Sequence, residues 1–236
     1  MARERKEYFF EYKMGFMLTV STIITVVGMI LPGYLMYFFW GDKHLFTFFT
    51  SNIYRLIIAF VVVFLWMVLH EIIHGLFYIL GGAQRKNITY GAALEKGIFY
   101  CRCGEYINKK TIMMSLMAPF TIIGVITLII GWITKQWWLV MLSGINIGGA
   151  GGDLCMFFFF LKRDADVNFM EYGDSATFSL KTAEDLDNKK FLSVKLIDKE
   201  KVPKNDNTHR LVVSKGSWVY FIILIVLFGL CLLLNL

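Results

Sequence analysis

The chain has 236 residues, of which 57% are hydrophobic and 17% aromatic, and its formal net charge is +6. A composition this apolar excludes an ordinary soluble domain of this size and indicates a protein that crosses a membrane several times. The basic residues do not form a stripe with interleaved aromatic residues, which argues against a nucleic-acid partner.

The chain opens with a charged stub, residues 1–13, that leads into an apolar run over residues 14–40. This run is longer than the hydrophobic part of a signal peptide, and no convincing small-residue cleavage site follows it. We therefore expect an uncleaved first span. With the short loop over residues 41–51, it makes up a first unit, residues 1–51.

A second span is predicted over residues 52–80, and it carries His-Glu-Ile-Ile-His at positions 70 to 74. Two histidines four positions apart lie one turn apart on one helical face, which suits two ligands of one tetrahedral Zn²⁺. Glu71 between them can take a proton from a water acidified by the cation. The alternative is that His70 and His74 are packed core residues. Ionisable groups within a span are costly and normally persist for function, which favours the metal site.

A polar connection punctuated by glycines follows over residues 81–110, and its part at 92–106 is expected to be strand-like or re-entrant. A third span is predicted over residues 111–134, interrupted by Pro119. A fourth span is predicted over residues 136–161.

The remainder of the chain is a polar segment and a last span. Residues 162–215 contain one strand-like run, at 191–197, and too little apolar surface for an independent core. Residues 217–236 form an apolar anchor. The fold class expected is an all-α polytopic membrane protein with about five transmembrane helices, a three-helix core within residues 52–161, and a small cytosolic segment.

Lysine and arginine residues are concentrated before the first span and in the second and fourth connections. By the positive-inside rule these parts lie in the cytosol, so the N-terminus is inside and the C-terminus outside, as five spans require. Cys101 and Cys103 then face the cytosol as well, where we expect ordinary reduced cysteines.

Zinc at a hydrolytic site takes three protein ligands and keeps one open position. The predicted spans contain only two acidic residues, Glu71 and Asp153. With Glu71 assigned to the water, Asp153 is the candidate third ligand. His70 and His74 lie about 27 to 33 Å along the second span, and Asp153 about 26 Å along the fourth, counted from the same side. The three side chains are therefore expected in one layer, nearer the cytosolic face.

Asp153 follows a glycine-rich stretch in which Gly144, Gly148 and Gly152 recur every four residues. This spacing lets helices approach closely. So many glycines also weaken a helix, and local unwinding that exposes backbone to a substrate is expected too. Asn146 precedes Asp153 by about two turns, on nearly the same face. It can hold a substrate backbone or a developing oxyanion, or equally bond to another helix.

Four segments resemble a family of bacterial membrane proteins described as putative zincin peptidases, distantly similar to site-2 proteases: His70 to Gly75, Cys101 to Cys103, Met117 to Pro119, and Gly149 to Leu154. The resemblance covers about residues 52–161. It implies a three-helix catalytic core in which His70, His74 and Asp153 bind Zn²⁺ and Glu71 is the base. It also implies a location in the bacterial cytoplasmic membrane.

The first functional interpretation is an intramembrane zinc endopeptidase that cuts a membrane-associated polypeptide near the cytosolic face, with residues 81–110 presenting the substrate by strand addition. The second is a membrane protein that transports or senses the cation through the same ligands. The two acidic residues within the spans lie at one depth, which favours a single metal site over a transport path for the cation. The third is a non-catalytic scaffold with a structural zinc. Such a site usually has four protein ligands, and Cys155 points about 200° away from Asp153 on a regular helix.

Overall fold

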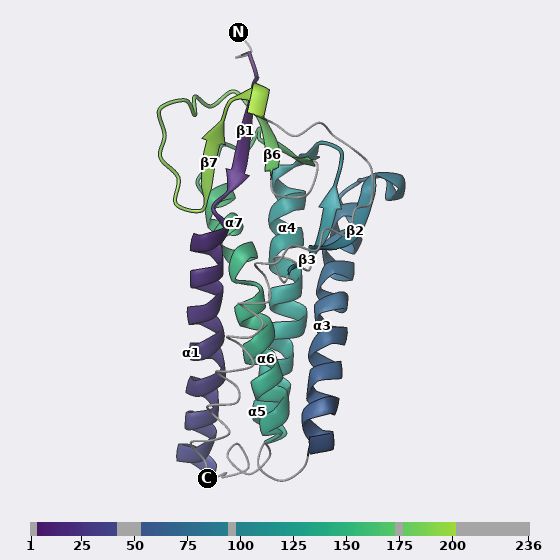
Figure 1. Ribbon diagram of the computed structural model, residues 1–236, viewed down its shortest axis with the longest axis vertical. Coiled ribbons are helices and arrows are strands. Elements are labelled where there is room, and N and C mark those ends of the chain that lie inside the picture. The colour runs from purple at the N-terminus through teal and green to yellow at the C-terminus, as the bar shows by residue number, and fades with distance from the viewer. Residues whose placement is uncertain (1–3, 42–52, 94–97, 173–176, 202–236) are drawn as a thin grey trace.

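The structure is a computed structural model that describes residues 4–41, 53–93, 98–172 and 177–201. Long helices stand side by side, and a layer of β-strands covers one end of them (Figure 1). The N-terminal strand belongs to this layer, so the charged start of the chain folds back onto later segments.

Three helical segments are long and apolar enough to cross a membrane, and a bent pair adds a fourth if it is counted as one span: Met14–Trp40, Val61–Leu80, Lys109–Ile133, and Trp137–Gly149 with Gly151–Leu161. These three to four candidate spans correspond to the first four predicted ones, and the third begins two residues earlier than predicted. The predicted last span, residues 217–236, lies outside the described residues, as does most of the predicted loop over residues 41–51.

Helix α1 (Met14–Trp40) packs along α6 (Trp137–Gly149), beside it in Figure 1. Glycines of α6 allow this approach. A Cβ added at Gly144 would collide with the backbone of Gly28, and one added at Gly148 would collide with Thr25. The stripe of small residues therefore brings the first helix against α6.

The second span is the unbroken helix α3 (Ile53–Leu80), and the third changes character along its length. It begins as α4 (Lys109–Pro119), where the Asn108 side chain caps the first turn by accepting from the Thr111 amide at 2.9 Å. It continues as a π-helical segment (Phe120–Val125) and ends as α5 (Ile126–Ile133). Pro119, predicted to interrupt this span, stands where the α-helix becomes a π-helix, because proline has no N–H for the helical ladder.

The fourth span is broken at Ala150, between α6 and α7 (Gly151–Leu161), and the two parts are bent by 49°. The local weakening expected from the glycine-rich stretch takes this form. Asp153 lies in the first turn of α7 as a result. The bend therefore sets where its carboxylate points.

The strand layer is a five-stranded antiparallel sheet in the order β4-β5-β6-β1-β7, so the expectation of an all-α protein is wrong. Its members are β1 (Lys6–Tyr12), β4 (Ile107–Asn108), β5 (Asn168–Tyr172), β6 (Thr177–Thr182) and β7 (Val194–Ile197). The charged N-terminal stub supplies β1, which pairs with β6 on one side and β7 on the other.

Aromatic packing explains why the described part of the polar segment, residues 162–172 and 177–201, is ordered although it has little core of its own. Phe10 of β1 stacks on Phe178 of β6 with ring centroids 5.2 Å apart. Phe160 at the end of α7 meets Phe169 of β5 edge-on at 5.3 Å. The sheet and the helix ends thus share one hydrophobic core, and neither the stub nor the segment has to build a core alone.

A separate two-stranded hairpin lies against α3: β2 (Ile88–Ala93) and β3 (Ile98–Cys103). It forms within the connection where strand-like structure was expected, although its first strand begins before residue 92. Tyr90 pairs with Cys101 across the hairpin. This register brings β3 to the helix that carries the two histidines.

Candidate metal centre

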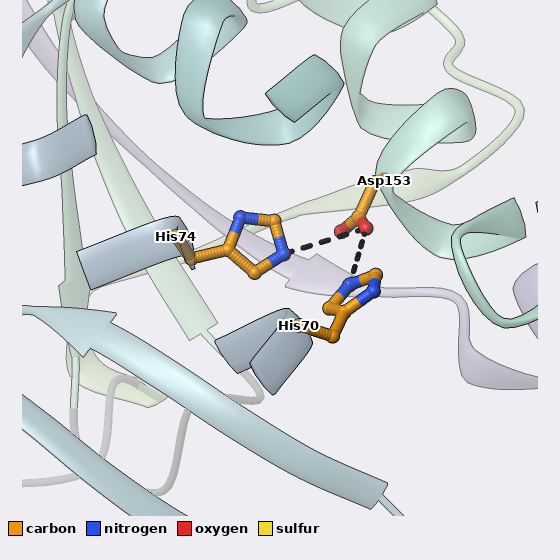
Figure 2. Close-up of side chains that lie close together, drawn as sticks. All are labelled: His70, His74 and Asp153. Carbon is orange, nitrogen blue, oxygen red and sulfur yellow. Dashed lines mark hydrogen bonds and ion pairs between the residues drawn. The ribbon is translucent and has the colours of Figure 1, made fainter. Parts of the chain in front are cut away.

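Two histidines of α3 and one aspartate of α7 converge on one point (Figure 2). The Nε2 atom of His70 lies 3.0 Å from Oδ2 of Asp153, and the Nε2 atom of His74 lies 3.4 Å from the same oxygen. One ligand atom from each residue falls within 4.8 Å of the others. The group can therefore hold a metal ion, and it joins two helices that the sequence separates by about eighty residues.

The outer nitrogens of both rings have acceptors of their own. Nδ1 of His74 lies 3.0 Å from the Ser115 carbonyl oxygen and 3.2 Å from its hydroxyl oxygen. Nδ1 of His70 lies 3.5 Å from Oδ1 of Asn146. A ring that donates its N–H through Nδ1 presents the Nε2 lone pair to the centre. Two such lone pairs and a carboxylate would repel one another without a cation between them, so this donor set fits a metal ion.

Ser115 is a member of this site that the sequence analysis did not identify. It is fully buried in α4, and its hydroxyl donates to the backbone carbonyl of His74 at 3.2 Å. The same residue thus contacts both the ring and the backbone of His74. A single serine in an apolar helix is a weak signal in sequence, because it is equally often a helix-packing residue.

Asn146 lies behind His70, on the side away from Asp153. Its oxygen faces the His70 ring, and its Nδ2 donates to the Pro119 carbonyl at 3.4 Å. The contact with Pro119 is the bond to another helix that was the alternative to an oxyanion role. The oxyanion role stays a prediction, while the contacts are those of a residue that orients a ligand.

A cavity of about 240 Å³ opens beside the centre, and Glu71 lines it together with His70, His74 and Asp153. The carboxylate of Glu71 accepts a backbone hydrogen bond from Cys101 of β3. The wall of the cavity comes from the helices on one side and from β1, β3 and β5 on the other. The candidate metal ligands and the candidate base therefore line a cavity that can hold a small group.

Glu171 of β5 adds a carboxyl group to the same cavity, and this residue was not predicted from the sequence. Burial raises the pKa of Glu171 to about 7, although the N–H of Cys103 and the charge of Arg102 act in the opposite direction. The only trace in sequence is an acidic residue within a short strand-like run of aromatic and apolar neighbours. Its arrival at the site depends on long-range pairing.

Cys101 and Cys103 do not belong to the group of potential ligands found among the described residues. Both are buried and unbridged. Burial raises the pKa of the Cys103 thiol to about 11 and moves the pKa of Cys101 in the same direction. Thiols that hold their protons this firmly are poor metal ligands, so the two side chains serve packing.

In helices of membrane-spanning length, a His-Glu-x-x-His motif thus meets an aspartate from a second helix, which is the donor arrangement of a zincin-type metal site. The model of a family described as "Putative zincin peptidase" matches residues 63–167. These residues belong to that family, and the resemblance noted from the sequence is confirmed. No match was found among curated proteins, and none among solved structures.

The matched region has a clear structural meaning. It contains the motif-bearing end of α3, the hairpin, and the bent pair α6 and α7, and so includes His70, His74 and Asp153. Strands β1, β5, β6 and β7 lie outside it. Glu171 therefore reaches the cavity from a part of the chain that the family model does not describe.

Proposed function

We propose that this protein is an intramembrane zinc endopeptidase that hydrolyses a peptide bond of a membrane-associated polypeptide. One observation carries the proposal: the Nε2 atoms of His70 and His74 converge with Asp153 at a cavity that Glu71 also lines. Membership of the family of zincin peptidases over residues 63–167 supports it.

His70, His74 and Asp153 would hold Zn²⁺, which when bound supplies a Lewis acid for activating water and polarising a peptide carbonyl. Ser115 and Asn146 hold the two rings through Nδ1, which keeps both Nε2 atoms aimed inward. Three protein ligands leave one position open, as a hydrolytic site requires.

Glu71 is the proposed general base. Its carboxylate would take a proton from the attacking water and pass it to the nitrogen of the leaving amine. The position of Glu71 between the two histidines fixes its distance from both, because all three residues share one turn of α3. The backbone bond from Cys101 holds its carboxylate at the cavity.

The substrate would be a membrane or membrane-associated polypeptide, presented by the hairpin of β2 and β3. Strand β3 borders the cavity next to Glu71, and an extended peptide could pair through its backbone with the outer edge of the partner strand β2, to which no described strand is hydrogen-bonded. The lysine and arginine distribution supports a cytosolic N-terminus and a site near the cytosolic face of the membrane, and the family resemblance implies the bacterial cytoplasmic membrane.

Transport or sensing of the cation finds less support. The acidic residues within the described candidate spans, Glu71 and Asp153, line one cavity and do not mark out a path. A transporter needs polar groups along its route. Cation uptake by proteoliposomes would be the result that revives this alternative.

Zinc content per chain tests the proposal, measured by elemental analysis of detergent-purified protein. We expect one zinc in the wild type and in Glu71→Gln, and its loss in His74→Ala and in Asp153→Ala. A quenched fluorescent single-span peptide in the same micelles should be cut by the wild type and not by Glu71→Gln. Zinc undisturbed by Asp153→Ala would refute the ligand set, and unchanged cleavage by Glu71→Gln would refute the base.

A further inference from the structure

Glu171 joins the two β structures of the molecule at the candidate centre. Its Oε2 accepts from the backbone N–H of Cys103 at 3.1 Å, and its Oε1 accepts from the hydroxyl of Tyr12 at 3.4 Å. Cys103 belongs to the hairpin, Tyr12 to β1, and Glu171 to β5. One carboxylate therefore ties the hairpin to the five-stranded sheet.

The bond to Cys103 continues along β3 to the proposed base. Cys101 and Cys103 are two positions apart, so their N–H groups point to the same edge of the strand. Glu171 accepts from Cys103, and Glu71 accepts from Cys101. Two carboxylates, from the sheet and from α3, thus occupy successive donors on one edge of β3.

We infer that Glu171 is a positioning residue: it anchors the edge of β3 to the sheet and through the Cys101 backbone holds Glu71 in the cavity. This inference rests on the proposed function only for the role of Glu71. The anchoring of β3 follows from the contacts alone. A side chain from outside residues 63–167 would then complete a site whose ligands lie inside that region.

Glu171 matters for the position of β3 because the hairpin forms a two-stranded sheet of its own, separate from the five-stranded sheet. Two strands alone are marginally stable in water, so β3 keeps a fixed place only through its contacts with the rest of the molecule. Glu171 supplies two such contacts, because it accepts from the Cys103 N–H and from the Tyr12 hydroxyl. Loss of the Glu171 carboxylate would free Cys103 first and then loosen Cys101, on which the direction of Glu71 depends.

Hydrogen exchange of the backbone amides tests the anchoring, measured by mass spectrometry on the full-length protein, loaded with zinc, in detergent micelles. Glu171→Leu should speed exchange at Cys103 by about tenfold, which corresponds to about 1.4 kcal/mol, and should also speed exchange at Cys101. Glu171→Gln keeps an acceptor oxygen and should stay within about threefold of the wild type. Glu171→Ala replaces the leucine variant if leucine prevents folding.

Glu11→Leu is the matched control, because Glu11 is an exposed acid of the same sheet. It should exchange like the wild type at both cysteines. Unchanged exchange in Glu171→Leu and Glu171→Ala, or exchange in Glu171→Gln as fast as in Glu171→Leu, would overturn the anchoring.

Cleavage of the quenched single-span peptide tests the step from β3 to Glu71. Glu171→Leu should lower kcat by about tenfold with KM and zinc content unchanged, and Glu171→Gln should recover most of the loss. A rise in KM alone, or loss of zinc, would overturn the positioning role. If the wild type cuts no peptide, the proposed function fails, while the exchange rates still decide whether Glu171 anchors β3.

Discussion

Removing the Ser115 hydroxyl should weaken zinc binding without removing any ligand. In the structure the Nδ1 atom of His74 has two acceptors, the Ser115 carbonyl at 3.0 Å and its hydroxyl at 3.2 Å. Ser115→Ala keeps the carbonyl and removes the hydroxyl. Loss of an outer-shell partner typically costs ten- to a hundredfold in metal affinity, and we expect about tenfold, or about 1.4 kcal/mol, because one acceptor remains.

The assay is competition for zinc against a chromophoric chelator of known affinity, in detergent micelles. Ser143→Ala is the matched control, because Ser143 is also fully buried and donates to the Gly124 carbonyl at 2.6 Å, away from both histidines. Both variants lose a buried hydroxyl, so a general loss of stability would weaken zinc binding in both. An affinity of Ser115→Ala within twofold of the wild type, or an equal loss in Ser143→Ala, would refute the reasoning.

Four further outcomes are expected. Gly148→Val should separate α1 from α6, because its side chain would collide with Thr25, and should cost about 1–3 kcal/mol of unfolding free energy, whereas Gly149→Val, with open space around its Cβ, should cost less; equal losses would contradict the close approach. Glu184→Ala should destabilise the protein by about 3 kcal/mol, because it removes the partner of a nearly buried arginine. Nη1 of Arg163 lies 2.9 Å from Glu184, and the Arg163 side chain is 8% exposed. Thermal unfolding beside the control Glu200→Ala measures this, and an unfolding temperature equal to that of the control would contradict it. The pKa of Glu171 is raised to about 7, so the folded state binds its proton more tightly than the unfolded state, and stability should fall as pH rises from about 4.5 to 7. Glu171→Gln should remove this decrease from a plot of unfolding midpoint against pH. Parallel plots for the wild type and the variant would refute the prediction. Chelation should lower the unfolding temperature of the wild type and leave that of His74→Ala unchanged, because only a folded site gains from bound zinc; an equal decrease in both would point to an effect of the chelator itself.

The metal group was predictable because its constraints are local or compositional. Spacing along one helix places His70 beside His74. Because the spans contain so few acidic residues, Asp153 was the one remaining candidate ligand. The glycines before it indicated a weakened helix, and the break between α6 and α7 sets the direction of the Asp153 side chain. These inferences need only residue spacing along a helix and the composition of the spans, and none of them needs the tertiary packing.

The sheet and the residues behind the ligands were not predictable in the same way. Lys6 pairs with Thr182 in the sheet, and no periodic pattern in the seven residues of β1 specifies a partner so distant. Glu171 reaches the cavity only through that pairing, and Ser115 contacts His74 only through the packing of α4 on α3. Such positions follow from tertiary structure, which overrides the local composition of the segments that carry them.

The place of β1 in the middle of the sheet, between β6 and β7, has a consequence for biosynthesis. Phe9 of β1 pairs with Ile197 of β7, and β1 is synthesised before both of its partner strands, so it must wait unpaired while the helices of the bundle insert. Closure of the sheet is then a late event that joins the beginning of the chain to its polar segment. A nascent chain that already contains the matched region, residues 63–167, still lacks the strand that carries Glu171. The candidate metal centre would thus be completed only after β5 has been synthesised, even though its three ligands are inserted earlier.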